Sequence, residues 1–212
     1  MELDIKDFLK DHSFITLVDI RGFSELDDEV QKEVIQDISN ITLKRFEEGG
    51  YKKALMIEAF IPTGDGFYMV GNAYNSLFYP GIIIYLALSL KNEIAEYIES
   101  KDRICEGVQI AIHFGSIVTF EDILSNRNYC GKGMNEAARL LSSKNRDEVE
   151  AIAKSFFNDG NRAIISEQTW VKSNSAENQK IRRTDPFHIK VKHDKVMECR
   201  FIDMDGVYSV LS

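Results

Sequence analysis

The sequence has few cysteines, and no two of them are spaced as a metal or redox motif would need. Three of the 212 residues are cysteine, Cys105, Cys130 and Cys199, and none forms a CxxC pair. This spacing argues against a zinc knuckle or a thiol redox centre. We expect buried free thiols in a reducing cytoplasm instead. A chain of this length can bury a core without disulfides or structural zinc.

An excess of basic residues is also absent. The formal net charge is −8 and the isoelectric point is about 5.1. A general nucleic-acid-binding protein normally has a basic face, so we expect no nucleic-acid partner. The acidic balance does not exclude a nucleotide substrate, because metal ions can bridge acidic side chains and phosphates.

Long apolar runs, repeats and Pro/Gly/Ser-rich linkers are missing as well. The most apolar stretch, 77–90, is too short for a membrane span and has Pro80 and Gly81 near its start. We predict a buried helix there and no membrane partner. The N-terminus is acidic and amphipathic, unlike a signal peptide, which favours a cytoplasmic location. We expect a single domain over 1–212.

The spacing of apolar residues predicts alternating strands and helices. We expect strands at 14–19, 54–61, 67–70, 107–113, 116–120, 163–165, 187–192 and 196–202, with 116–120 pairing back onto 107–113. We expect helices at 25–48, 74–100, 133–142 and 147–157. This order is typical of an α+β fold of the ferredoxin-like kind, with a mostly antiparallel sheet and helices packed on one face.

Two aspartates are candidate metal ligands. Asp19 ends the first predicted strand, and Asp65 lies in the turn 63–66 of a predicted hairpin. In a ferredoxin-like sheet the first strand lies beside that hairpin, so the two carboxylates can converge. Hard oxygen ligands suit Mg²⁺ or Mn²⁺, and a pair of such ions can activate an attacking oxygen and stabilise a leaving one.

The turn after Asp19 is a candidate phosphate site. The segment 20–24 runs into a predicted helix N-terminus, whose backbone N–H groups favour a polyphosphate. Each feature alone is weak evidence, because an Asp-Gly turn is usually only a turn and an aspartate that ends a strand is usually only a cap.

Four segments in order carry a resemblance to a known family. They are FITLVDIRGFSEL, IPTGDGFYMV, VQIAIHFGSIV and GKGMNEAARLL. Together they resemble the catalytic domain of class III nucleotidyl cyclases, the adenylate and guanylate cyclase family, over about 14–142. The resemblance implies a nucleoside triphosphate substrate and two divalent ions, Mg²⁺ or Mn²⁺. It implies that Asp19, Asp65 and the carbonyl of Ile20 hold the metals, and that 20–23, with Arg21, Gly22 and Phe23, cradles the triphosphate.

The resemblance also assigns residues on the last of these segments. Asn135 would orient the ribose and Arg139 would stabilise charge on the α-phosphate; four residues apart, they share one face of a helix. The ordinary alternatives are a surface or capping role for Asn135 and an ion pair with Glu136 for Arg139. In this family a head-to-tail homodimer builds each site from both protomers, one supplying the aspartates and the other the Asn/Arg pair.

A lysine near the C-terminus contacts the triphosphate in this family. Lys190, Lys192 and Lys195 are candidates here, and Lys192 is the one we predict. A surface lysine is the ordinary alternative for each.

The base-reading positions depart from the purine cyclases. Ile61 and Asn128 stand where adenylate cyclases have a lysine and an aspartate, and where guanylate cyclases have a glutamate and a cysteine. The Ile61 side chain can neither donate nor accept a hydrogen bond. The Asn128 side-chain amide can do both, and so could face a pyrimidine edge. With the segment His113-Phe114-Gly115, the chain resembles the bacterial pyrimidine cyclases of Pycsar antiphage defence. That resemblance implies cyclic UMP, or cyclic CMP less favoured, acting on a separate effector protein.

Three alternatives stay open on the sequence. The first is an adenylate or guanylate cyclase with atypical base contacts, which product identity would distinguish. The second is a catalytically inactive cyclase-like module for nucleotide sensing or dimerisation, although both aspartates and the Asn/Arg pair are present. The third is an unrelated ferredoxin-like binding domain, which would show no metal-dependent nucleotide binding that Asp65→Ala abolishes.

Overall fold

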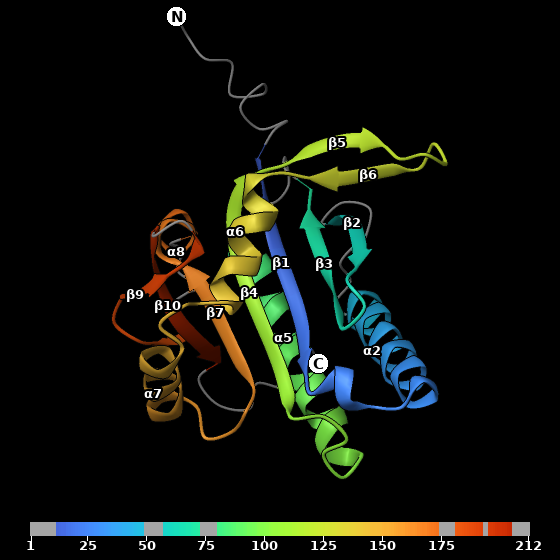
Figure 1. Cartoon of the computed structure of the whole chain (residues 1–212), viewed down its shortest axis with the longest axis horizontal. Coiled ribbons are helices and arrows are strands. Elements are labelled where there is room, and N and C mark those ends of the chain that lie inside the picture. The colour runs from blue at the N-terminus through green and yellow to red at the C-terminus, as the bar shows by residue number, and fades with distance from the viewer. Residues whose placement is uncertain (1–11, 49–56, 73–79, 174–180, 193–194, 205–212) are drawn as a thin grey trace, which may run out of the picture.

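A mostly antiparallel sheet forms the centre of the computed structural model, which describes residues 12–48, 57–72, 80–173, 181–192 and 195–204 (Figure 1). Within these ranges the sheet order is β2-β3-β1-β4-β7-β10-β8, with β9 paired to β10. Its neighbours are antiparallel except β4 and β7, which run parallel. The strands are β1 (His12–Arg21), β2 (Ile57–Pro62), β3 (Gly66–Gly71), β4 (Gly107–Ser116), β7 (Arg162–Ser166), β8 (Ile181–Arg183), β9 (Phe187–Lys190) and β10 (Val196–Met204). The predicted α+β class is therefore confirmed.

Helices cover both faces of this sheet, so the expectation of helices on one face was wrong. The helices are η1 (Phe23–Glu25), α2 (Asp28–Glu48), α5 (Pro80–Ser100), α6 (Lys132–Leu141), α7 (Arg146–Phe156) and α8 (Glu167–Lys172). Phe14, Val18 and Ile20 of β1 belong to the core that also contains residues of α2 and α5. Ile15 and Leu17, which alternate with them, pack with residues of α6 and α7 instead. Because successive strand residues point to opposite faces, the two helix layers lie on opposite sides.

The two central strands are apolar on both faces. In β1 the run 13–18 is buried throughout, and β4 is buried at most of its positions. A strand buried on both faces reads as a continuous apolar run rather than an alternation. This is why 14–19 was recognisable as a strand, although the run itself does not say that helices cover both sides.

The predicted pairing of 116–120 with 107–113 was also wrong. Val118–Glu121 forms β5, which pairs with β6 (Arg127–Cys130) in a separate two-stranded ribbon that projects from the main sheet (Figure 1). The Asp122 carboxylate closes its turn by accepting hydrogen bonds from the backbone N–H groups of Leu124 and Asn126, at 2.8 and 2.9 Å. A short, mostly exposed strand such as β6 carries little apolar periodicity, so the prediction missed it.

Other expectations agree with the structure to within a few residues. The first predicted helix is divided into η1 and α2, while the short α8 and β8 were not predicted. Residues 54–56 and 74–79 of two predicted elements lie outside the described residues.

The described part of the apolar stretch is a buried helix, α5, and no helix among the described residues is long and apolar enough to cross a membrane. Cys105 and Cys199 are buried free thiols as expected, but Cys130 is exposed on β6, which corrects that prediction.

Candidate active site

The strand pairing brings Asp19 and Asp65 together. Asp19 is paired with Gly66, the first residue of β3. Asp65 immediately precedes Gly66 in the hairpin turn, so it lies beside Asp19. The backbone N–H of Ile20 donates to the Asp65 carbonyl oxygen at 2.9 Å, which puts the Ile20 peptide at the same turn. Thr63 Oγ1 lies 3.2 Å from Asp65 Oδ1 and supports that carboxylate. The three predicted metal ligands are therefore neighbours.

The two carboxylates interact unfavourably when no cation is present. Burial and, after it, the neighbouring Asp65 carboxylate together raise the pKa of Asp19 to about 6, while Arg21 acts in the opposite direction. A divalent cation bound between two close carboxylates would offset their electrostatic repulsion. Mg²⁺ commonly binds one or two carboxylates and takes its remaining ligands from water and phosphate oxygens. Among the described residues no cluster of three or more His, Cys, Asp or Glu side chains is placed to hold a metal. Two carboxylates fit an ion that takes few ligands from protein side chains.

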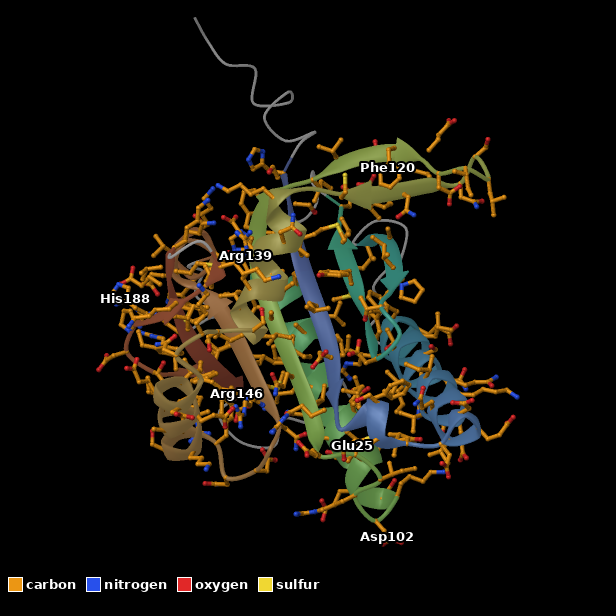
Figure 2. All side chains as sticks on the ribbon, viewed as in Figure 1. Glu25, Asp102, Phe120, Arg139, Arg146 and His188 are labelled. Carbon is orange, nitrogen blue, oxygen red and sulfur yellow. The ribbon has the colours of Figure 1, made fainter. Side chains whose placement is uncertain are left out.

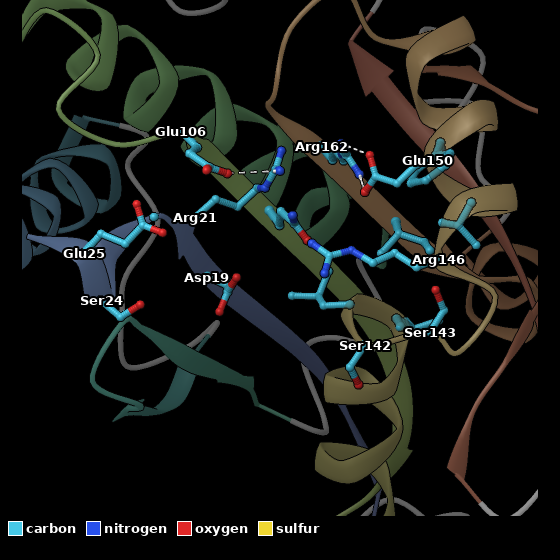
Figure 3. Close-up of a pocket in the computed structure, with 17 residues that line it drawn as sticks. Asp19, Arg21, Ser24, Glu25, Glu106, Ser142, Ser143, Arg146, Glu150 and Arg162 are labelled. Atoms are coloured by element: carbon cyan, nitrogen blue, oxygen red, sulfur yellow. Dashed lines mark hydrogen bonds and ion pairs between the residues drawn. The ribbon is translucent and has the colours of Figure 1, made fainter.

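A cavity of ≈ 570 Å³ opens beside Asp19, between the sheet and the helices α6 and α7 (Figure 3). Three arginines line it: Arg21 from β1, Arg146 from the start of α7 and Arg162 from β7. Arg21 pairs with Glu106 at 3.1 Å and Arg162 with Glu150 at 2.5 Å. The Arg146 side chain extends towards the middle of the lining residues (Figure 3). Arg146 and Arg162 were not predicted as site residues, because nothing in the local sequence pattern connects them to Asp19.

The turn after Asp19 differs in detail from the expectation. A three-residue 3-10 helix, η1, follows Asp19, and α2 begins only at Asp28. Gly22 lines the cavity and has φ 76°, where a Cβ would also come 3.1 Å from Glu106 Cγ, so this position favours glycine. The Phe23 side chain is buried in the core, which leaves only its backbone available to a phosphate. The helix predicted to begin at residue 25 therefore begins three residues later, and the short helix η1 occupies the end of the turn.

Asn135 and Arg139 lie on α6, as predicted, away from the lining of this cavity. Asn135 is exposed and Arg139 is partly exposed on the same helix, and Figure 2 shows Arg139 projecting from α6. The cavity beside Asp19 is lined instead by the residues that follow, Leu140 to Ser143. Glu136 contacts His113 and Lys132, at 3.1 and 3.5 Å, so the ordinary alternative of an Arg139–Glu136 ion pair has no support.

The two predicted base-reading residues meet in a second cavity. Ile61 from β2 and Asn128 from β6 both line a hollow of ≈ 470 Å³. Asn128 Oδ1 accepts a hydrogen bond from the Tyr129 backbone N–H at 2.9 Å, which leaves the Asn128 NH₂ group as a donor. Glu58 and Arg127 also line the hollow and pair with each other at 2.5 Å.

The three candidate lysines lie elsewhere. Lys190 is exposed on β9, and Lys192 and Lys195 are exposed beside it. Within the described residues the lining of the Asp19 cavity includes no lysine. The cationic side chains that line this cavity in the described part of the chain are arginines, and the role of Lys192 stays a prediction.

Comparisons with known proteins identify the fold. No family model matches the sequence, and no curated protein matches it by sequence. The structure matches the guanylate cyclase domain of RhGC from Catenaria anguillulae with GTP, at TM-score 0.60 and 15% identity, covering 92% of this chain and 97% of that one. It matches the guanylyl cyclase Cya2 at TM-score 0.59 and 15% identity, covering 95% and 96% of the two chains. It matches a Trypanosoma brucei adenylate cyclase at TM-score 0.59 and 13% identity, covering 96% and 93%. The chain therefore has the fold of the catalytic domains of class III adenylyl and guanylyl cyclases.

Proposed function

We propose that this protein is a class III nucleotidyl cyclase whose substrate is a pyrimidine nucleoside triphosphate, UTP in preference to CTP. The observation that carries the proposal is the Asp19–Asp65 carboxylate pair beside a cavity lined by arginines. Carboxylates that hold a divalent ion, with cations around them, suit a bound triphosphate. The fold shared with cyclase domains of known structure supports the same activity.

In the proposed reaction the ribose 3′-oxygen bonds to its own α-phosphorus, the hydroxyl loses its proton and pyrophosphate leaves. Asp19, Asp65 and the Ile20 carbonyl would hold one or two Mg²⁺ or Mn²⁺ ions. These ions would lower the pKa of the ribose 3′-hydroxyl and neutralise negative charge on the phosphates. Arg146 and the N–H groups near Gly22 would orient the triphosphate within the cavity. Arg139 would meet the charge that develops on the α-phosphate.

The same proposal requires a homodimer. Asn135 and Arg139 do not line the cavity beside Asp19 in their own chain, so a second protomer would bring them to it. The β5–β6 ribbon supports association, because Val118, Phe120, Ile123 and Leu124 expose apolar side chains on it. Exposed apolar groups gathered on one projecting element are typical of a protein interface.

The base pocket supports a pyrimidine with an acceptor at its edge. With Oδ1 engaged by Tyr129, the Asn128 amide presents N–H donors to the hollow that it shares with Ile61. Uracil carries a carbonyl oxygen at the position where cytosine carries an amino group. The N–H donors of Asn128 would therefore favour UTP over CTP, because the cytosine amino group would place a second donor opposite them. We extend the proposal to a cytoplasmic second-messenger role in antiphage defence, with the product acting on a separate effector protein.

One experiment tests the activity and its specificity together. The purified protein is incubated with ATP, GTP, CTP and UTP in Mn²⁺ and, separately, in Mg²⁺, and cyclic products are identified by mass spectrometry. We expect cyclic UMP as the main product. Cyclic AMP or cyclic GMP as the sole product would contradict the pyrimidine assignment but agree with the proposed cyclase activity. No cyclic product with either metal, at concentrations where the protein is dimeric, would favour an inactive nucleotide-sensing module.

A further inference from the structure

A buried histidine joins the sheet to helix α6. His113 of β4 is only 1% exposed, and both of its ring nitrogens have partners. Nδ1 lies 2.9 Å from Ser166 Oγ at the end of β7, and Nε2 lies 3.1 Å from Glu136 Oε2 in α6. The ring therefore connects β4, β7 and α6 through a single side chain.

The hydrogen bonds around this ring favour a neutral imidazole protonated on Nε2. The Gln168 amide nitrogen also lies 3.4 Å from Nε2, and it donates to the Phe114 carbonyl oxygen at 3.3 Å. The Phe114 backbone N–H donates to Thr169 Oγ1 at 2.7 Å, and Thr169 Oγ1 lies 2.6 Å from Ser166 Oγ. The Thr169 hydroxyl then donates to Ser166, and the Ser166 hydroxyl donates to Nδ1 of His113. The Nε2–H group is left to donate to the Glu136 carboxylate, so no donor in the chain lacks an acceptor.

The surroundings favour this neutral form. Burial lowers the pKa of His113; the Glu136 carboxylate raises it, and Lys132 and Lys172 lower it. The net direction is downward, so the ring is neutral at physiological pH. A neutral Nε2–H donor facing a carboxylate makes a charge-assisted hydrogen bond inside the protein, where such bonds are stronger than in water.

Two glycines let α6 come close enough for this contact. A Cβ on Gly115 of β4 would come 2.7 Å from Gly133 Cα and 2.9 Å from His113 Nε2. A Cβ on Gly133 would come 2.6 Å from Ile15 Cδ1 and 2.8 Å from Ser116 O. The first turn of α6 therefore rests directly on the backbone of β4, and only glycine permits that approach.

Glu136 lies between the two proposed catalytic residues of the same helix. It follows Asn135 directly and precedes Arg139 by three positions. Across the described residues, α6 has no side-chain cap at its N-terminus, where Gly131 stands. Its rotation about its own axis is set by packing, by the Glu136 contact and by the Tyr68 hydroxyl, which donates to the Met134 carbonyl oxygen at 3.4 Å.

We propose that His113 and Glu136 are a pair of positioning residues that fixes the orientation of α6, and through it Asn135 and Arg139, for catalysis. The inference rests on the proposed function. Neither residue needs to touch the substrate, because the pair acts through the helix. A displacement of about 1 Å of a substrate-orienting group can lower the rate roughly a hundredfold.

The test compares Glu136→Ala with Glu136→Gln and with a matched control, Lys132→Ala. The control removes the other partner of Glu136, an exposed lysine one turn earlier on α6, and leaves the contact with His113. We expect Glu136→Ala to lower kcat at least tenfold while KM changes little, because ground-state binding is retained. Glu136→Gln should regain most of the rate, since its amide oxygen still accepts from Nε2–H. Lys132→Ala should match the wild type.

Hydrogen exchange of the α6 backbone amides gives a readout that does not depend on activity. We expect faster exchange across α6 in Glu136→Ala and unchanged exchange in the lysine control. Ser166→Ala, which removes the donor to Nδ1, takes its place if the alanine variant fails to fold. Exchange and kcat like those of the control would overturn the inference. If the wild type makes no cyclic nucleotide, the proposed function fails by itself, and unchanged α6 exchange in Glu136→Ala would still overturn the positioning role.

Discussion

At the scale of single residues, the best-defined feature is the pair of carboxylates at the end of β1. Asp19 was recognisable because it ends an apolar run, and Asp65 because it sits in an Asp-Gly turn. Their adjacency follows from the antiparallel pairing of β1 with β3. A buried carboxylate beside another costs stability when no cation offsets the charge, so folding alone does not favour this pair.

The first prediction concerns that cost. Asp19→Asn should abolish turnover, because one metal ligand is lost, and should raise the melting temperature of the protein in chelator, because the repulsion with Asp65 is relieved. Turnover is measured by product formation and stability by thermal unfolding. Asp65→Ala should also be inactive and folded. A turnover rate near that of the wild type in either variant would rule out the proposed metal site.

A second prediction concerns the base pocket. Asn128→Asp replaces the amide donor with a carboxylate that only accepts, so the preference should move from UTP towards CTP, whose amino group donates. We expect a shift of roughly tenfold or more in the ratio of kcat/KM values. Competition between the two nucleotides measures it. Asn128→Ala is the control, and it should lower kcat/KM for both nucleotides without changing which one is preferred. If Asn128→Ala also moved the preference to CTP, Asn128 would not be the residue that contacts the base.

At the scale of elements, an ion pair fastens helix α7 to the sheet. Glu150 of α7 accepts two hydrogen bonds from Arg162 of β7, at 2.5 and 2.6 Å. The hydrogen bonds from Arg162 are the largest cause of a lowered Glu150 pKa. The pair also borders the cavity beside Asp19, so it holds one wall of the proposed triphosphate site in place.

The third prediction follows from the sign of this shift. A carboxyl whose folded pKa is lowered stabilises the protein fully above its unfolded pKa and loses that contribution as pH falls through the folded value. Glu150→Gln should therefore destabilise the protein by about 1–3 kcal/mol at pH 7 and by progressively less below about pH 4.5. Urea unfolding at several pH values measures the difference. Glu99→Gln, in an exposed pair with Arg103, should have almost no effect at any pH. A Glu150→Gln effect that does not shrink in acid would show that the pair is not its source.

At the scale of the whole molecule, the proposed site is divided between two protomers. The aspartates and the cavity arginines lie at one end of β1, while Asn135 and Arg139 lie on α6 outside the cavity lining. The Ile61–Asn128 hollow lies between β2 and β6 and shares no residue with that cavity. The proposed metal ligands and the proposed base contacts thus come from separate places in one chain, as the proposed shared dimer site requires.

The fourth prediction tests this division. Asp65→Ala and Arg139→Ala proteins should each be inactive, and mixing them should restore up to about a quarter of the wild-type activity, because half of the dimers are mixed and each has one intact site. Product formation is measured against mixing ratio, with mass spectrometry confirming mixed dimers. Mixed dimers without activity would contradict the shared site.

The features that could be predicted from the sequence are local. Apolar runs and helical periodicity identified the central strands and the long helices, since burial on a strand or helix face imposes a spacing that neighbouring residues reveal. Asp19, Asp65, Asn135 and Arg139 were found because each sits in a short segment of recognisable pattern.

Features that depend on contacts between distant segments became visible in the folded structure. It placed helices on both faces of the sheet, directed 118–121 into a separate ribbon, and brought Arg146 and Arg162 to the cavity of Asp19. It also joined His113 to Glu136 through the close approach of two glycines. These contacts are set by how strands pair and how helices pack, and no local spacing encodes the partner that a side chain meets across the fold.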